Sequence, residues 1–435
     1  MHDVLDPRDL VVDEAEQLAS EGYPSAALAE SARDAAARGG MAELAAIALQ
    51  LEQLQRAKDW RYGEPNDEAS IFASLDGQFE KRTKASSLQD RVMGAWLGRM
   101  VGCTMGKPVE GLPKEEVRSY LDASPGWPGF LPLLPTLPAG VSRLHESAPY
   151  ATIGNFDAAP RDDDLDWTML NLHVLERYGI AATSEDFARE WLDRIPFTQT
   201  YTAERAAYRN LVHGVAIPAT ARVKNPYREW IGALIRADIF GLEHPGVPAQ
   251  AARQAFVDAR LSHTGNGIYG EMWAAALVSS ALVVDAPEEA LRIALGYVPP
   301  TSRLHAVLED VLELYGKHGT ADDALGYADR ELGHYNWVHT INNAALISIG
   351  LLWGGGSLVD SVALTVRGGA DTDSDGATVG SVMGALLGVR GVPHDMVAQF
   401  HNRARSAVRG FDRIAIDELA DRTIRLSGEL ALATS

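Results

Sequence analysis

Two short segments of this sequence concentrate carboxylates. Residues 162–166 read Asp-Asp-Asp-Leu-Asp, and residues 371–375 read Asp-Thr-Asp-Ser-Asp. Carboxylates this close repel one another unless solvent or a cation lies between them. Hard divalent cations take oxygen ligands from Asp, Ser and Thr side chains. A solvated turn or a helix cap is the better explanation of one such cluster, but two clusters in one chain favour a shared metal site.

The downstream cluster matches the opening of an EF-hand loop, and this reading can be tested. An EF-hand requires a bidentate Glu at loop position twelve, where this chain has Val382. A turn that presents Asp371, Asp373 and the Ser374 hydroxyl at the start of a helix suits an octahedral Mg²⁺ or Mn²⁺ ion better. A helix cap by Asp373 or Ser374 is the alternative, and it is compatible with metal binding.

The upstream cluster precedes a helix face spaced for burial, over residues 167–175. Asp162, Asp163 and Asp164 fall in or just before the first turn of that helix, where negative charge also favours the helix dipole. Four carboxylates in five residues exceed what a cap needs. We therefore interpret these aspartates as further metal ligands.

Two other segments are candidates for substrate binding. A turn that leads into an apolar helix from Ile268 contains Ser262, His263, Gly265, Asn266 and Gly267. Backbone N–H groups at such a helix start can bind a phosphate, although an ordinary Asn-Gly turn explains the pattern equally well. His339 and Asn343 open another apolar helix, where they fit either a capping arrangement or a binding role.

Several common catalytic motifs are missing. The segment from Gly102 to Pro108 differs from a phosphate-binding loop, because it is one residue short between the glycines and has proline where Ser or Thr is needed. The sequence has no G-x-S-x-G elbow and no H-E-x-x-H zinc motif. Cys103 is better explained as a small core residue than as a nucleophile.

The elements that must position these residues are predicted to be helices. Alanine, leucine and charged residues recur at helical spacing, and long alternating strand patterns are missing, so we expect an all-α fold. Residues 9–57 predict two or three helices, broken at residues 22–24 and 39–40. We place a domain boundary near residue 86, with an N-terminal helical extension and connector over 1–86 and a catalytic domain over 87–430. The proline- and glycine-rich segment 125–161 predicts a long ordered loop, which in compact domains is often functional.

Two glycine repeats predict unusually close helix packing. An interior helix glycine costs about 1 kcal/mol relative to alanine, so two runs of four need a reason. Spacing of four places each run on one stripe, along which another helix can approach to backbone contact. Charged residues around the first run exclude a membrane-spanning interpretation. The runs are Gly94, Gly98, Gly102 and Gly106, and Gly376, Gly380, Gly384 and Gly388.

Composition narrows the class of protein. The 435 residues are 46% hydrophobic, enough for a large core in one or two domains, and the net charge of −20 argues against nucleic-acid and anionic-membrane partners. A single cysteine excludes internal disulfides and fits a reducing compartment. The segment MHDVLDPRDL has no signal-peptide pattern, and no apolar stretch is long enough to span a bilayer. We therefore expect a soluble, cytoplasmic protein.

Four segments together resemble the ADP-ribosylglycohydrolase family in their order and approximate spacing. The resemblance covers about residues 87–425, its last segment is the most specific, and residues 1–86 lie outside it. The segments are DRVMGAWLGRMVGCTMGKPVEG, DDDLDWT, SHTGNGIYGEM and RGGADTDSDGATVGSVMGALLG. The resemblance implies an all-α fold, two Mg²⁺ ions (Mn²⁺ in some members) and hydrolysis of an N- or O-glycosidic bond to ADP-ribose. By motif, Glu110 stands where the family has a mobile active-site glutamate, and the implied metal ligands are Asp163, Asp164, Asp371, Asp373 and Ser374.

The sequence departs from the family pattern at several positions. The family usually has Thr at the positions of Asp162 and Leu165; a carboxylate can still coordinate, so we keep Asp162 as a ligand, whereas Leu165 cannot coordinate. The usual Gly-Asp of the first motif is Gly102-Cys103, and residues 225–232 replace a Gly-Asn-Gly-Ser loop. We interpret the chain as a divergent branch. We expect a small ADP-ribosyl or nucleotide-like substrate, with an ADP-ribosylated protein as the alternative.

The residues and the resemblance predict the same chemistry. Divalent ions held by the two acidic clusters would bind ribose hydroxyls and orient a water at the anomeric carbon. Nearby carboxylates would stabilise the oxocarbenium-like transition state. Proton transfer needs a carboxylate free of full metal coordination, for which Glu110 is the first choice and Asp162 or Asp166 the next. Two other functions stay open, an N-glycosidase of a small nucleoside-like metabolite and a non-catalytic ADP-ribose-binding or structural relative.

Overall fold

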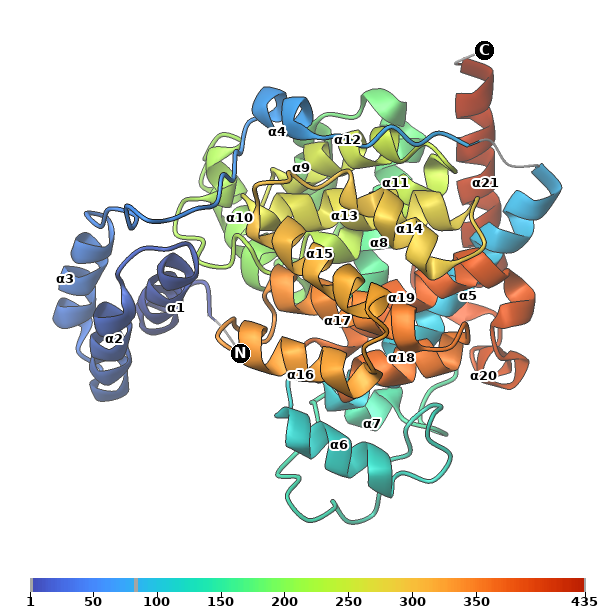
Figure 1. The fold of residues 1–435 in the computed structure, drawn as a ribbon, viewed down its shortest axis with the longest axis horizontal. Helices are drawn as coiled ribbons and strands as arrows, with labels where there is room; N and C mark the ends of the chain where they lie inside the picture. Colours follow the sequence, from blue (N-terminus) through green and yellow to red (C-terminus); the bar gives the residue numbers. More distant parts are fainter. Residues whose placement is uncertain (1–2, 82–84, 434–435) are drawn as a thin grey trace.

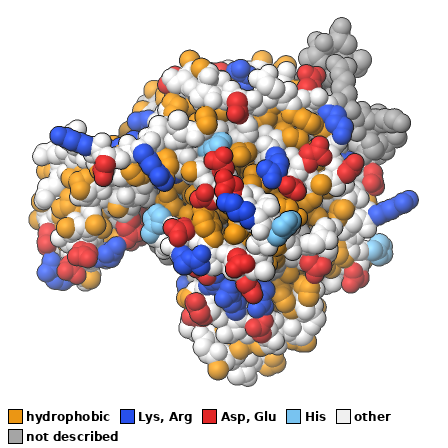
Figure 2. Space-filling model, viewed as in Figure 1, with side chains coloured by type: hydrophobic (Ala, Val, Ile, Leu, Met, Phe, Trp, Pro, Cys, Tyr) orange, Lys and Arg blue, Asp and Glu red, His pale blue; other side chains and the backbone are white. Residues whose placement is uncertain are grey.

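The computed structural model describes residues 3–81 and 85–433, and it confirms the predicted all-α fold (Figure 1). Within these residues the only strands are β1 (Arg403–Ala404) and β2 (Ile414–Ala415), which pair antiparallel with Arg403 opposite Ala415. No described helix combines the length and the apolar character needed to cross a bilayer. Figure 2 shows acidic and basic side chains interspersed over the face that it presents.

Helix α5 (Ala85–Gly106) and helix α19 (Thr372–Leu387) pack on each other more extensively than any other pair of helices. Their glycine stripes face each other, which confirms the close helix approach that the spacing predicted. A Cβ built on Gly98 would lie 2.0 Å from the carbonyl oxygen of Gly380, and one built on Gly102 would lie 1.9 Å from that of Gly376. Only glycine permits this approach. The helices run antiparallel, so the C-terminal end of α5 meets the N-terminal end of α19.

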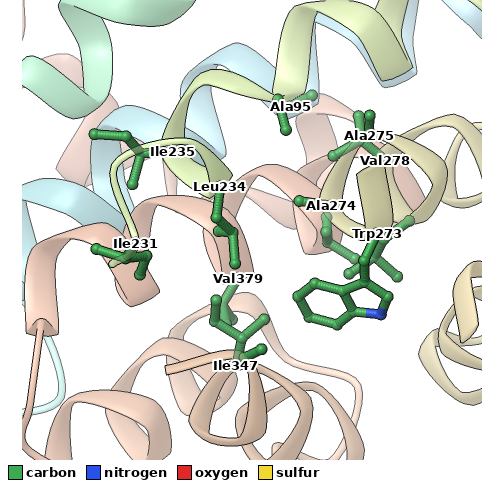
Figure 3. Packing of buried hydrophobic residues seen from close by; sticks show 14 of the residues in the cluster. Ala95, Ile231, Leu234, Ile235, Trp273, Ala274, Ala275, Val278, Ile347 and Val379 are labelled. Carbon is green, nitrogen blue, oxygen red and sulfur yellow. The ribbon is translucent and has the colours of Figure 1, made fainter. Parts of the chain in front are cut away.

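Other helices enclose this pair. Helix α18 (Leu358–Arg367) packs on both, α13 (Asn266–Ala281) and α17 (Thr340–Trp353) pack on α19, and α21 (Ile416–Ala433) packs on α5. Helix α13 is largely apolar and every one of its residues is buried, as expected for a helix surrounded by others. Figure 3 shows Trp273 of α13, Ile347 of α17 and Val379 of α19 in this core.

The remaining helices of the main body form outer layers around the core. The α-helices are α6 (Lys114–Ala123), α7 (Ala148–Ala151), α8 (Asp163–Tyr178), α9 (Ser184–Arg194), α10 (Thr202–Val212), α11 (Asp238–Glu243), α12 (Pro248–Ala259), α14 (Pro287–Leu295), α15 (Arg303–Gly316), α16 (Ala321–Leu332) and α20 (His394–Ala398). The 3₁₀ turns are η1 (Lys107–Val109), η2 (Gly179–Ala181), η3 (Phe197–Gln199), η4 (Ala219–Ala221), η5 (Leu234–Arg236) and η6 (Val389–Gly391). The predicted loop 125–161 is irregular except for α7.

Three N-terminal helices form a lobe beside the main body (Figure 1). They are α1 (Pro7–Ser20), α2 (Ala26–Arg38) and α3 (Met41–Leu51). The breaks between them include Gly22 and Gly39, where the sequence predicted them, and both glycines have positive φ. Their apolar faces share a hydrophobic cluster of their own. The predicted connector contains α4 (Glu68–Ser74), and its residues 82–84 lie outside the described residues. The boundary near residue 86 stays a prediction.

Candidate active site

The two acidic clusters lie at the N-terminal ends of two helices that meet. Asp162 caps α8, and its carboxylate accepts the N–H of Asp164 at 3.1 Å. Helix α19 begins after Asp371, so Asp373 and Ser374 lie in its first turn and are not its caps. The Ser374 hydroxyl donates to Oδ2 of Asp164 at 3.4 Å. Asp162 therefore caps α8 and also belongs to the acidic cluster. Through Ser374 and Asp164, segments more than 200 residues apart in sequence come into direct contact.

Burial and mutual repulsion perturb these carboxylates. Burial, followed by the nearby charge of Asp373, raises the pKa of both Asp164 and Asp371 well above its usual range. Burial and the charge of Asp164 raise the pKa of Asp375 in the same direction. One oxygen of Asp164 and both oxygens of Asp375 lack a hydrogen-bond donor. Buried carboxylates in this state are stabilised by a cation.

The side chains fall into two groups that fit a divalent ion. Within each group the ligand atoms all lie within 4.8 Å of one another. Carboxylate oxygens are the ligand type that Mg²⁺ and Mn²⁺ prefer, so the carboxylates of both groups fit such an ion. One group is Glu110, Asp371 and Asp373, and the other is Cys103, Asp162 and Asp164.

A lysine that the sequence reasoning did not single out joins the two groups. Lys107 is the first residue of η1, and its ammonium contacts Oδ2 of Asp162. The same nitrogen lies 3.6 Å from Oδ2 of Asp373. Burial opposes ionisation of Asp373, but the Lys107 charge and the hydrogen bonds with Glu110 and Asp371 together lower the pKa of Asp373. Its place directly after the first glycine run was visible in the sequence, although its contact with both clusters was not.

Glu110 lies at the rim of the cluster. Its side chain is 20% exposed, whereas those of Asp162 and Asp373 are 4% exposed or less. Burial and the charge of Asp373 raise the pKa of Glu110 well above its usual range. Nδ1 of His145, from the long loop 125–161, lies 3.4 Å from its Oε2. The sequence reasoning missed His145, because an irregular loop gives no periodicity that would place one of its residues near another segment.

Asp166, the last candidate for proton transfer, has its carboxylate engaged elsewhere. One oxygen accepts from the Ser406 hydroxyl at 2.6 Å and from the N–H of Ala407 at 2.9 Å. The other forms an ion pair with Arg161 at 2.7 Å. These contacts connect α8 to the C-terminal segment. They favour Glu110 over Asp166 as the proton-transfer residue.

Comparison with known proteins shows the family of this chain. Residues 84–431 match the family described as ADP-ribosylglycohydrolase. The chain belongs to the ADP-ribosylglycohydrolase family. Among solved structures it is similar to one titled "ADP-ribosylglycohydrolase-related protein complex", with 22% identity, a TM-score of 0.47, and 79% of this chain and 99% of that chain covered. A search of curated proteins gave no match. Membership in this metal-dependent family supports a hydrolase of ADP-ribosyl-type glycosidic bonds.

Of the residues predicted to bind substrate in this family member, Asn343 lies at the acidic cluster. Its Oδ1 accepts the N–H of Asp371 at 3.2 Å, while its Nδ2 donates to the carbonyl oxygens of Trp337 and His339. Asn343 thus fixes the backbone of a candidate metal ligand.

The other predicted binding residues gather around a buried glutamate. Both the N–H and the Nδ2 of Asn266 donate to Glu229, at 3.0 and 2.8 Å. The N–H of Gly265 donates to the side chain of Asn66, and that of Gly267 to the carbonyl of Thr264. The start of α13 therefore binds the chain's own carboxylate, so an anionic ligand there would have to displace Glu229.

Two histidines complete this second region. Nδ1 of His263 lies 2.8 Å from the Ser262 hydroxyl. His339 caps α17 through its Nδ1, and its Nε2 lies 3.6 Å from Glu229. Burial disfavours the charge of Glu229, but Arg303, which donates to both its oxygens, acts together with His339 and Asn266 and holds the pKa of Glu229 well below its usual range. A direct role of these histidines in substrate binding stays a prediction.

The N-terminal lobe contacts the same region. Gln17 of α1 donates to Glu229 at 2.9 Å. Arg228 forms ion pairs of 2.8 Å with both Glu14 and Glu21. Between the lobe and the segment 303–339 lies a cavity of about 860 Å³, whose walls include Trp60 and none of the carboxylates of the two metal-ligand groups. The lobe is thus attached to the family domain through charged contacts.

Proposed function

We propose that this chain is a divalent-metal-dependent hydrolase that cleaves a glycosidic bond of an ADP-ribosyl or related ribosyl or nucleotide substrate. The observation that carries the proposal is the convergence of carboxylates from three elements: the start of α8, the start of α19 and the turn after α5. Family membership supports the class of reaction. The metal, the residue roles and the substrate are the parts proposed here.

The acidic residues of both helix starts are proposed to hold up to two Mg²⁺ or Mn²⁺ ions. Bound ions there would supply Lewis acidity towards ribose hydroxyls and towards a water at the anomeric carbon. The proposed ligands are Asp162, Asp163, Asp164, Asp371, Asp373 and Ser374. The side chain of Asn343 accepts the N–H of Asp371 and so holds the backbone that carries one of these carboxylates.

Glu110 is proposed to move the proton. Its raised pKa keeps it protonated to a higher pH than an ordinary glutamate, which suits a general acid towards the leaving group. Its partial exposure lets it reach a substrate, and His145 beside it offers a second hydrogen-bonding group. Carboxylates that are not protonated would stabilise the cationic character that develops at the anomeric carbon.

The test uses the full chain with Mg²⁺ or Mn²⁺ and three substrates: ADP-ribosylated arginine, O-acetyl-ADP-ribose and an NAD-derived nucleotide. Release of ADP-ribose or a ribose fragment, measured by chromatography, is the expected result. Turnover of small substrates only would identify a small-metabolite glycosidase. Binding without any product would instead identify a non-catalytic relative and refute the proposal.

Variants connect the activity to the site. Asp371→Ala and Asp373→Ala should abolish metal binding and turnover while leaving the helical circular dichroism spectrum largely intact. Glu52→Ala removes an exposed carboxylate from the N-terminal lobe and is the matched control. Unchanged metal affinity by calorimetry in both site variants would refute the shared metal site.

A further inference from the structure

The side chain of Lys107 enters the acidic cluster. Only 11% of the Lys107 side chain is exposed. Its Nζ contacts Asp162 at the start of α8 and lies 3.6 Å from Asp373 in the first turn of α19. An ammonium is a compact charge with three donors, so it can serve two carboxylates at once. Lys107 therefore stands between the two groups of candidate metal ligands.

The two groups differ in the ligands that they offer. Glu110, Asp371 and Asp373 present oxygen atoms alone. The other group combines two carboxylates with the thiol of Cys103, and hard ions such as Mg²⁺ and Mn²⁺ disfavour sulfur. Lys107 contacts Asp162, a member of this second group, more closely than it contacts Asp373. The ammonium thus lies against a carboxylate of the less suitable group, and it lies near Asp373 of the other group at the longer distance.

A divalent ion and this ammonium compete for the same oxygen atoms. Like charges at such short range repel strongly in a buried site. The backbone of Lys107 has little freedom to withdraw, because Pro108 and Val109 beside it in η1 are buried and Pro108 has a fixed φ. The lysine is therefore part of the site in the folded chain.

We propose that Lys107 takes the place of one cation, so that this chain binds one tight divalent ion, held at Asp371 and Asp373 beside Glu110, instead of two. This inference rests on the proposed metal site and narrows it. The ammonium is then a positioning group, because it holds the carboxylates of Asp162 and Asp373 where a second ion would otherwise hold them.

The test counts bound ions and does not depend on turnover. Mn²⁺ is titrated into the full chain, and free Mn²⁺ is measured by electron paramagnetic resonance. Wild type should bind one tight ion per chain, whereas Lys107→Met and Lys107→Gln should each bind two. Lys107→Arg keeps the charge and should stay at one. Lys114→Met removes a lysine of α6 that pairs with Asp329 and should also stay at one.

Each outcome decides the inference. Two tight ions in wild type would overturn it, and so would a single ion in folded Lys107→Met and Lys107→Gln, with folding checked by circular dichroism. Hydrolysis by wild type carrying two ions would refute this inference and leave the proposed function standing. No bound ion and no hydrolysis in wild type would refute both.

Discussion

Replacing Gly98 by alanine tests the packing on which the site depends. The added Cβ would lie 2.0 Å from the carbonyl oxygen of Gly380, whereas ordinary contact begins at 3.4 Å. The obstacle is backbone, so no side chain can rotate away to make room. The two helices must separate by more than about 1 Å, and both belong to the buried core.

The size of the effect follows from two opposing terms. Overpacking a core typically costs about 1–3 kcal/mol, and a backbone obstacle inside the most extensive helix contact places this site at or above the upper end. Alanine gains about 1 kcal/mol over glycine in helix propensity. We expect a net loss of about 2 kcal/mol or more. In a chain of 435 residues the entropy of unfolding is about 0.9 kcal/mol/K, so the melting temperature falls by only about 2 °C.

Urea unfolding is therefore the better assay. Gly316→Ala is the matched control, because Gly316 lies at the end of α15 with open space around its Cβ position. It should leave stability unchanged or raise it by up to about 1 kcal/mol. In the double variant Gly98→Ala with Gly380→Ala, the loss should be smaller than the sum, because the first separation makes room for the second side chain. Equal midpoints for Gly98→Ala and Gly316→Ala would refute the packing argument.

Three further predictions follow from the same contacts. Gly106→Ala should weaken both Mn²⁺ affinity and stability, because the added Cβ would press on the carbonyl of Thr372 at the start of α19. A calorimetric Mn²⁺ titration that matches wild type would contradict this prediction. Asp166→Asn should lower the free energy of unfolding in urea by about 1–3 kcal/mol, because it breaks a buried ion pair and hydrogen bonds. The number of bound ions should stay the same, and lost metal binding would show instead that Asp166 is a ligand. Burial raises the pKa of Glu243 from 4.5 to about 8, so between these values the folded chain binds the extra proton and stability falls as pH rises. Glu243→Gln should therefore stabilise the protein more at about pH 8.5 than at about pH 5.5 in urea unfolding, and an equal gain at both would exclude this titration.

The parts of the fold that could be predicted have local or strictly periodic signals. Helix breaks at Gly22 and Gly39 follow from the backbone freedom of glycine. The two glycine runs predicted a close helix pair because their cost in isolated helices demands compensation by packing. Which helix each run packs on did not follow from the spacing, and the structure shows that the two runs pack on each other. The crowding of carboxylates in residues 162–166 and 371–375 likewise indicated one explanation for both clusters, a shared metal site.

The parts that could not be predicted depend on long-range contacts between residues of ordinary type. Lys107 is one of many basic residues, and nothing in its own segment shows that its ammonium contacts Asp162. His145 comes from an irregular loop. The turn before α13 fitted a phosphate site and an ordinary Asn-Gly turn equally well, and in the structure the N–H of Asn266 donates to Glu229, which comes from another segment. Side-chain identity gives the chemistry that a residue can do, and only the fold decides which partner it meets.

The register of the central helix pair connects packing to chemistry. Gly98 faces Gly380 and Gly102 faces Gly376, so continuation of the same antiparallel register brings Gly106 against Thr372. The residues that follow α5 must then lie beside the first turn of α19, where Asp373 is located. A side chain at Gly106 would push the turn carrying Lys107 and Glu110 away from the acidic cluster. The glycine repeat therefore sets the distance between the proposed proton-transfer residue and the proposed metal ligands, as well as the stability of the core.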